Sequence, residues 1–157
     1  MNYKRVFIDG YSYFITMVIA RREPLLIDNI DLLRNAFRLS KERYNYKIEA
    51  IVILPEHLHM IITPQIAKEY PKIISHIKRS FVYALDNSIK DEAKLKLSHA
   101  KYRRANSGIW QERYYEHTIR DEKDLLEKLE YIKFNPIKHK LVDNINNWKY
   151  SSFYKNR

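Results

Sequence analysis

The most apolar stretch of the chain, Glu49–Thr63 (EAIVILPEHLHMIIT), constrains the fold more than any other segment. Pro55 interrupts this stretch, which predicts either two short strands or one bulged strand. Apart from two histidines, both faces of its second half are apolar, a pattern that is typical of a strand buried inside a sheet. We therefore expect this segment to lie at the centre of a β-sheet.

The two histidines of this stretch, His57 and His59, are separated by a single residue. Side chains alternate across a strand, so both imidazoles are expected to project from one face. Two imidazoles on a rigid element form half of a divalent-metal site. However, a His-x-His tripeptide can arise by chance in a chain with six histidines, and buried histidines often only hydrogen-bond to backbone. The tripeptide alone leaves both interpretations open.

The remaining pattern predicts an α+β fold, a two-layer sandwich in which helices cover a central antiparallel β-sheet. Its expected elements are a strand at 11–20, a helix at 28–44 capped by Asp28, the stretch 49–63, a helix beginning at Pro71 with Ile74, Ile77, Phe81 and Leu85 buried, a solvated loop or short irregular helix at 88–106, a strand at 109–120, and a helix from Asp121 that Pro136 ends near Asn135.

Charge and composition narrow the function classes. The chain carries 29 Lys and Arg against 19 Asp and Glu, a net charge of +10 that favours a polyanionic partner. Nucleic acid is preferred over an anionic membrane, because no long basic amphipathic helix stands out. Only two glycines are present, which excludes a P-loop and a glycine-rich dinucleotide turn. The absence of cysteine excludes disulfides, thiolate zinc sites and a cysteine nucleophile.

Length and hydropathy predict one domain over residues 1–157. No uncharged apolar run is long enough to span a bilayer, and the first residues (MNYKRVFIDGYSYF) do not resemble a signal peptide. We therefore expect a cytoplasmic protein that does not associate with membranes.

Thirteen tyrosines make a phenolate nucleophile a candidate, since cysteine and a Gly-x-Ser-x-Gly elbow are both absent. A tyrosine and an amide four residues later share one helical face. Three pairs have this spacing: Tyr83 with Asn87, Tyr102 with Asn106, and Tyr131 with Asn135. The last pair flanks the apolar stripe of the final predicted helix. About one such pair is expected by chance, so a boundary tyrosine and a helix-terminal asparagine remain the alternative.

Several blocks of sequence resemble the IS200-like, single-tyrosine HUH transposases, and in particular their REP-associated group. Residues 55–59 (PEHLH) are similar to the Pro-Asn-His-x-His element of that family. Residues 110–120 and 131–142 (YIKFNPIKHKLV) are similar to its Trp…Tyr-Ile-x-x-Asn-Pro-x-x-x-x-Leu-Val signature, and residues 148–153 (WKYSSF) to its Trp-x-x-Ser-Ser tail. One departure is Glu56, which stands where the family usually has asparagine; by alternation we expect it to face away from the histidines.

The resemblance implies an HUH fold of the ferredoxin or RRM-like type and an enzyme that nicks and rejoins single-stranded DNA near hairpins. It implies that His57, His59 and Asn135 bind a divalent metal, Mg²⁺ or Mn²⁺. Tyr131 would attack a phosphodiester and form a 5′-phosphotyrosine link. A non-catalytic hairpin-DNA-binding protein that keeps the fold, for instance a repressor, is the alternative. A metal-dependent hydrolase that uses water is a third, more remote hypothesis.

Two groups of side chains are candidates for DNA binding, through phosphate contacts or base stacking. They are Lys78 and Arg79 on the second predicted helix, and Lys101, Tyr102, Arg103 and Arg104 further along the chain. A solvated, charged surface is the alternative for each. The partner implied by the resemblance is single-stranded DNA with a hairpin, in a bacterial, nucleoid-associated setting. The oligomeric state stays open, because such proteins include homodimers that exchange catalytic helices as well as monomers.

Overall fold

The computed structural model describes residues 5–155, in which four strands form one antiparallel sheet with the order β2-β3-β1-β4. The strands are β1 (Ser12–Val18), β2 (Tyr46–Ile53), β3 (His57–Pro64) and β4 (Tyr115–Ile119). This strand order, with helices between β1 and β2 and between β3 and β4, is that of the ferredoxin-like split β-α-β fold. The predicted α+β fold with a central antiparallel sheet is confirmed.

The apolar stretch forms the centre of the sheet, as the sequence predicts. Pro55 lies in the turn between β2 and β3, which the Leu54 N–H closes by donating to the His57 carbonyl at 2.8 Å. The two halves are therefore two paired strands. Seven of the eight residues of β3 are buried, because the strand has neighbours on both edges and helices on both faces.

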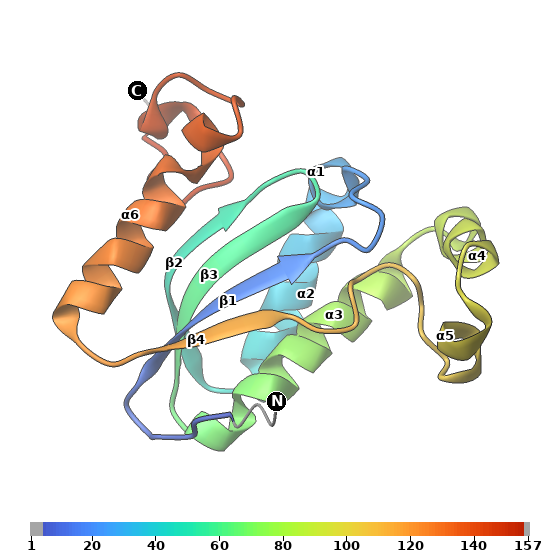
Figure 1. Cartoon of the computed structure of the whole chain (residues 1–157), viewed down its shortest axis with the longest axis horizontal. Helices are drawn as coiled ribbons and strands as arrows, with labels where there is room; N and C mark the ends of the chain where they lie inside the picture. Colours follow the sequence, from blue (N-terminus) through green and yellow to red (C-terminus); the bar gives the residue numbers. More distant parts are fainter. Residues whose placement is uncertain (1–4, 156–157) are drawn as a thin grey trace.

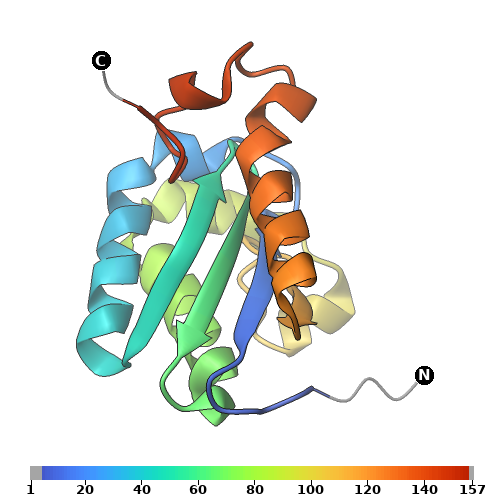
Figure 2. The same cartoon turned by 90° about the vertical axis from the view of Figure 1, so that its left-hand side faces the viewer.

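Helices cover the two faces of the sheet unequally (Figures 1 and 2). They are α1 (Leu25–Asp28), α2 (Ile30–Arg43), α3 (Tyr70–Ala84), α4 (Asn87–Leu95), α5 (His99–Arg103) and α6 (Glu122–Lys138), with short 3-10 turns at Ala67–Glu69 and Ile145–Asn147. The larger core joins α2 and α3 to one face, and a smaller core joins Ile132 of α6 to the other through residues such as Phe14 and Ile61. Figure 2 shows α6 in front of the strands and α3 behind them.

Several predicted elements differ in detail. Asp28 belongs to α1 and does not cap α2, and the strand predicted at 109–120 is regular only from Tyr115, after an isolated bridge at Trp110. Residues 88–106 hold α4 and α5, whose N-caps Asp86 and Ser98 accept hydrogen bonds from backbone N–H groups. Pro136 does not end α6, which runs on to Lys138. A proline this close to a helix end removes only one backbone donor.

The C-terminal segment lies along the outer edge of β2. The Ile53 N–H donates to the Tyr150 carbonyl at 2.8 Å, and the Ser152 N–H donates to the Ile51 carbonyl at 2.9 Å. The Ser152 hydroxyl also accepts from the Ile51 N–H at 2.8 Å, and the Trp148 indole donates to the Ile53 carbonyl at 2.9 Å. This segment therefore takes the place of a fifth strand, and the Trp-x-x-x-Ser spacing sets its contacts.

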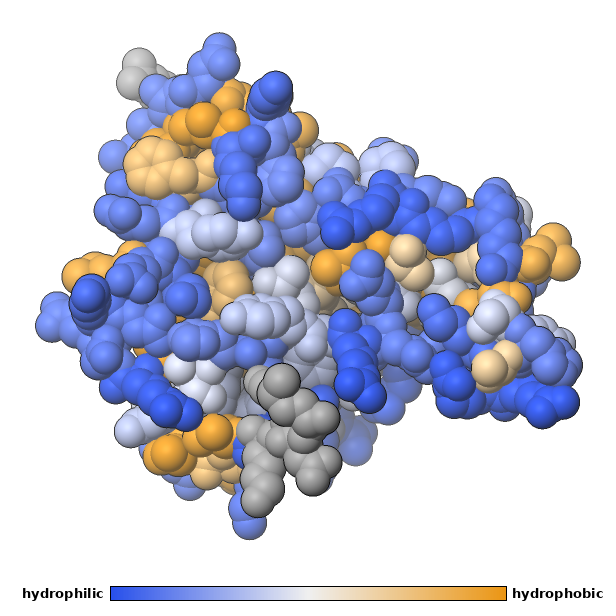
Figure 3. All heavy atoms as spheres, in the orientation of Figure 1, coloured by the Kyte–Doolittle hydropathy of each residue, from blue (hydrophilic) through white to orange (hydrophobic). Residues whose placement is uncertain are grey.

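The surface of the protein is strongly polar. Figure 3 shows hydrophilic residues over most of one face, with apolar residues gathered in small, separate groups. Within residues 5–155, no helix is both long enough and apolar enough to cross a bilayer.

Candidate active site

His57 and His59 lie on the face of β3 that α6 covers. Each is only 5% exposed, and their ring centroids are 4.9 Å apart. Leu58 and Met60, the residues that alternate with them, belong to the core on the opposite face. The prediction that both imidazoles project from one face of a strand is confirmed.

A hydrogen bond at Nδ1 orients each imidazole. Nδ1 of His59 lies 2.7 Å from Oγ1 of Thr16, its register partner on β1. Nδ1 of His57 lies 2.8 Å from Oε1 of Glu56. Because a carboxylate only accepts, His57 donates here and keeps the lone pair on Nε2. Carboxylates often orient metal-binding histidines in this way.

The expectation that Glu56 faces away from the histidines is wrong. Glu56 lies in the turn before β3, not within the strand, so the alternation of strand side chains does not apply to it. The turn allows its carboxylate to reach back to the adjacent His57 ring. Glu56 thereby contacts a candidate ligand through the ring nitrogen Nδ1.

Both histidines are held in the neutral form. Burial lowers the pKa of His57, and it lowers the pKa of His59 to about 3, with smaller contributions in the same direction from the neighbouring His57, His139 and Lys138 side chains. Neutral imidazole is the form that coordinates metal ions. The pair is therefore ready to bind a cation at neutral pH without first losing protons.

Helix α6 places three polar side chains against this pair. Tyr131, Asn135 and His139 are spaced by four residues and so share one face near the C-terminal end of the helix. The Tyr131 ring lies 5.1 Å from the His59 ring, and the His139 ring lies 5.0 Å from the His57 ring. Asn135 lies between them on the same face of the helix and is 1% exposed. The structure thus brings both predicted halves of the site together within one chain.

Three buried polar atoms of this site have no hydrogen-bond partner within residues 5–155: Nε2 of His59 and both amide atoms of Asn135. Buried polar atoms are normally paired, so this group calls for an explanation. An imidazole nitrogen and an amide oxygen are ligands that Mg²⁺ or Mn²⁺ accepts, and His57, His59 and Asn135 therefore fit the implied metal. In the part of the chain described, no group of three or more His, Asp and Glu residues could hold a metal, so a third protein ligand would have to be of another type, such as the Asn135 amide oxygen.

Tyr131 opens onto a cavity of about 460 Å³ beside the histidines. Its side chain is 39% exposed, Phe14 packs edge-on against its ring at 5.8 Å, and the Lys138 ammonium lies 5.1 Å from the ring centre. The cavity is also lined by Thr16, Tyr115, Glu127 and Lys128. The phenol is therefore positioned by its neighbours and still accessible to a bulky substrate.

The basic residues predicted to bind DNA lie on other elements, α3 and α5, and not around Tyr131. Lys78 donates from Nζ to the carbonyls of Gln111 and Glu112 at 3.1 and 3.4 Å, and burial lowers its pKa. Arg104 forms an ion pair with Glu112 at 3.0 Å. The remaining four, Arg79, Lys101, Tyr102 and Arg103, are exposed. Their role in DNA binding stays a prediction.

Sequence reasoning missed four neighbours of the site: Phe14, Thr16, Lys138 and His139. The spacing of His139, four residues after Asn135, is a signal that could have identified it, but the helix was expected to end before it. Thr16 carries no such signal, because its contact with His59 depends on the register between β1 and β3.

Comparisons with known proteins agree with this geometry. The sequence profile of the family described as IS200-like transposases matches residues 8–135. A REP-associated tyrosine transposase of Escherichia coli K12 is 32% identical over 156 residues, which cover 98% of this chain and 83% of that protein. A protein of Haemophilus influenzae assigned to the same group is 39% identical over 156 residues, with 98% and 86% covered.

A solved structure has the same fold. It is that of a REP-associated tyrosine transposase bound to a REP hairpin, and it superposes with a TM-score of 0.77 at 30% sequence identity. The match covers 98% of this chain and 82% of the other. The likeness therefore includes the sheet and α6, the two elements that carry the site.

Proposed function

Since this chain belongs to the IS200-like transposase family, among its REP-associated members, we propose that it cuts and rejoins single-stranded DNA beside a hairpin. The observation that supports this chemistry best is the placement of Tyr131, whose ring lies 5.1 Å from that of His59. It also lies one helical turn from the amide of Asn135, which has no hydrogen-bond partner among residues 5–155. Hairpin DNA is proposed as the partner because the relative of known structure is bound to a REP hairpin.

We expect His57, His59 and Asn135 to hold Mg²⁺ or Mn²⁺. When bound, the cation would neutralise charge on the scissile phosphate and polarise its oxygens. All three side chains are uncharged ligands, since burial keeps both imidazoles neutral. The protein ligands would therefore leave the charge of the cation available to the phosphate. The Glu56 carboxylate would act by orienting His57, whose Nδ1–H it accepts at 2.8 Å.

Tyr131 supplies the nucleophile. Its phenolic oxygen forms a bond to phosphorus, and the bond between phosphorus and the 3′ oxygen breaks. The phenolic proton passes to solvent, and the released 3′ oxygen takes up a proton to become a hydroxyl. The 5′ end of the DNA stays joined to Tyr131, and the reverse attack by a 3′-hydroxyl rejoins strands. One phosphate ester replaces another at each step, so no nucleotide cofactor is required.

The neighbours of Tyr131 orient it for this attack. Phe14 contacts the phenol ring edge-on and also stacks on the His59 ring at 5.6 Å, so one side chain fixes the nucleophile relative to a metal ligand. Lys138 lies over the same phenol ring. Holding the reacting groups in this arrangement lowers the entropic cost of reaching the transition state.

An adduct assay tests the proposal. End-labelled hairpin DNA with single-stranded flanks is incubated with Mn²⁺, and protein–DNA adducts that survive denaturation are measured. We expect an adduct with the wild type and none with Tyr131→Phe, which should still bind the hairpin. Tyr102→Phe is the matched control, because Tyr102 has the same spacing to an asparagine but lies on α5. The substitution removes only the hydroxyl and keeps the ring that could stack on a base, so this variant should form the adduct.

Two results would contradict the proposal. Normal adduct formation by Tyr131→Phe would mean that another residue is the nucleophile. Tight binding by the wild type without any adduct on hairpins drawn from repeated genomic palindromes would favour the non-catalytic DNA-binding protein.

A further inference from the structure

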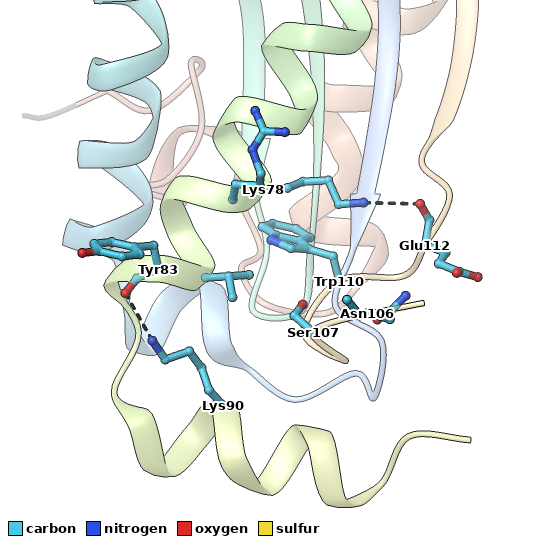
Figure 4. A pocket seen from close by; sticks show the side chains of 10 residues that line it. Lys78, Tyr83, Lys90, Asn106, Ser107, Trp110 and Glu112 are labelled. Atoms are coloured by element: carbon cyan, nitrogen blue, oxygen red, sulfur yellow. Dashed lines mark hydrogen bonds between the residues drawn. The ribbon is translucent and has the colours of Figure 1, made fainter. Parts of the chain in front are cut away.

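A groove lies between α3 and the segment that follows α5, on the side of the sheet opposite α6 (Figure 4). Its volume is about 500 Å³. We call it the α3 groove, and its main lining residues are Arg79, Val82, Tyr83, Lys90, Ser107 and Trp110. A second hollow, which adds Lys94 and Tyr102, shares Val82, Lys90 and Ser107 with it and extends it along α4.

Trp110 provides the α3 groove with an unused hydrogen-bond donor. The indole is 4% exposed and packs against Phe81 at 5.5 Å, yet its Nε1–H has no acceptor within residues 5–155. Figure 4 shows this ring in the middle of the groove, among the side chains that line it. Because a buried donor without an acceptor is costly, a ligand that brings an acceptor would gain that hydrogen bond.

The rim of the α3 groove combines an exposed aromatic ring with positive charge. Tyr83 is 87% exposed, and the Lys90 ammonium lies 6.0 Å from its ring centre while donating to its carbonyl at 3.3 Å. The one carboxylate among the lining residues, Glu112, is paired with Arg104. Aromatic platforms surrounded by cations are the usual means of holding unpaired nucleotides.

The chain links the α3 groove directly to the catalytic end of the sheet. Gln111, the residue after Trp110, donates its N–H to the Val18 carbonyl at 2.8 Å, and Val18 is the register partner of His57. The groove and the histidines thus lie on opposite faces of one end of the sheet, with the segment at 109–112 between them. To reach the groove, a single strand that leaves Tyr131 would have to pass round this edge.

We propose that the α3 groove binds one unpaired nucleotide of the single-stranded flank next to the hairpin. The base of this nucleotide accepts a hydrogen bond from Nε1–H of Trp110 and stacks on Tyr83, and Arg79 and Lys90 contact the phosphates on either side of it. The identity of the ligand as DNA rests on the proposed function. The site itself rests on the unused indole donor, the exposed ring and the surrounding cations.

Binding measurements on the non-cleaving Tyr131→Phe protein test this site. Dye-labelled hairpin DNA carries one abasic position, moved stepwise along the flank, and its affinity is measured by fluorescence anisotropy at fixed salt. We expect one abasic position to weaken binding about tenfold, as the loss of one stacked base does, and the others to have little effect. Trp110→Phe keeps the ring and its packing but removes the donor, and it should weaken binding of the intact DNA about fivefold.

Combining the abasic position in the DNA with Trp110→Phe in the protein gives the decisive measurement. In Trp110→Phe, the abasic substitution at the sensitive position should weaken binding much less than it does in the protein with Trp110, because the base and the indole donor act as a pair. Trp148→Phe is the matched control; its indole donates to the Ile53 carbonyl far from the groove, and it should keep the full abasic effect. Equal sensitivity at all flank positions, or an unchanged abasic effect in Trp110→Phe, would overturn the proposal.

A second variant guards against an effect on folding. Tyr83→Ala alters a side chain that is 87% exposed, so the melting temperature should not change, while binding at the same flank position should weaken severalfold. These measurements need no cleavage. Failure of the wild type to form an adduct would refute the nicking chemistry and leave this result standing, and a flat abasic series would refute the α3 groove alone.

Discussion

Replacing Asn135 with leucine should make the metal-free protein more stable and should also abolish metal binding. Asn135 is 1% exposed, and neither of its amide atoms has a hydrogen-bond partner in the described chain. Leucine has a similar size and no polar atoms. The substitution therefore removes two desolvated groups from the folded state and at the same time removes the ligand oxygen.

The magnitude follows from those two atoms. Each unpaired buried polar group costs about 1–3 kcal/mol, and a misfit of the new side chain costs up to about 1.5 kcal/mol. We expect a net gain of about 2 kcal/mol, which for a chain of this length corresponds to a melting temperature roughly 4–8 °C higher. For the wild type, Mn²⁺ at about 100 times its dissociation constant should add about 2.7 kcal/mol.

Thermal unfolding with EDTA and with Mn²⁺ checks both parts. Asn135→Leu should melt above the wild type in EDTA and should gain little from Mn²⁺. Asn87→Leu, at an exposed position on α4, is the control and should stay within about 0.5 kcal/mol of the wild type in both buffers. The reasoning fails if Asn135→Leu is less stable than the wild type in EDTA, or if Mn²⁺ stabilises the two proteins equally.

Three further predictions follow from single contacts. Burial lowers the pKa of His59 to about 3, so below pH 6.5 the unfolded chain takes up a proton that the folded chain does not, and the free energy of unfolding should fall by about 2 kcal/mol between pH 6.5 and pH 5. Urea unfolding should show a smaller fall in His59→Gln, whereas His99→Gln, at an exposed position, should show the same fall as the wild type. Thr16→Val removes the hydroxyl at Nδ1 of His59 and should weaken Mn²⁺ binding about 10–100-fold in a calorimetric titration; unchanged affinity would contradict the positioning role. Gly108→Ala should lower stability by more than about 1 kcal/mol, because φ is +77° and the added Cβ would lie 2.9 Å from the Ala93 carbonyl oxygen; an unaltered melting temperature would contradict this.

The fold was largely predictable because burial and backbone chemistry act locally. A strand that is apolar on both faces must be covered on both of them, which favoured a central position for β3, and Pro55 separated it from β2. The errors arose where local rules compete. Pro136 disfavours a helix, but so close to the end of α6 it breaks only one hydrogen bond, and the helix continues.

The site was only half predictable from the residues. Strand alternation placed His57 and His59 on one face, but nothing local indicated that α6 covers that face. The link to Tyr131 and Asn135 came from resemblance to a family, because the four-residue spacing occurs three times in the chain. Periodicity does not encode contacts between distant elements.

The hydrogen bonds to the histidines were beyond the reach of the sequence for a different reason. The Thr16 contact requires the β1–β3 register, and the Glu56 contact requires the geometry of a turn. Both depend on angles and offsets that one sequence does not specify.

The C-terminal segment along β2 also bears on how the protein behaves at high concentration. An uncovered outer strand offers unpaired N–H and C=O groups to any other extended chain, and such edges promote aggregation and misplaced pairing. Here Tyr150 and Ser152 already occupy those groups on Ile51 and Ile53, and the Trp148 indole fastens the segment in place. A chain shortened before Trp148 would keep every proposed catalytic side chain but would expose the unpaired edge of β2, so we expect it to self-associate at high concentration.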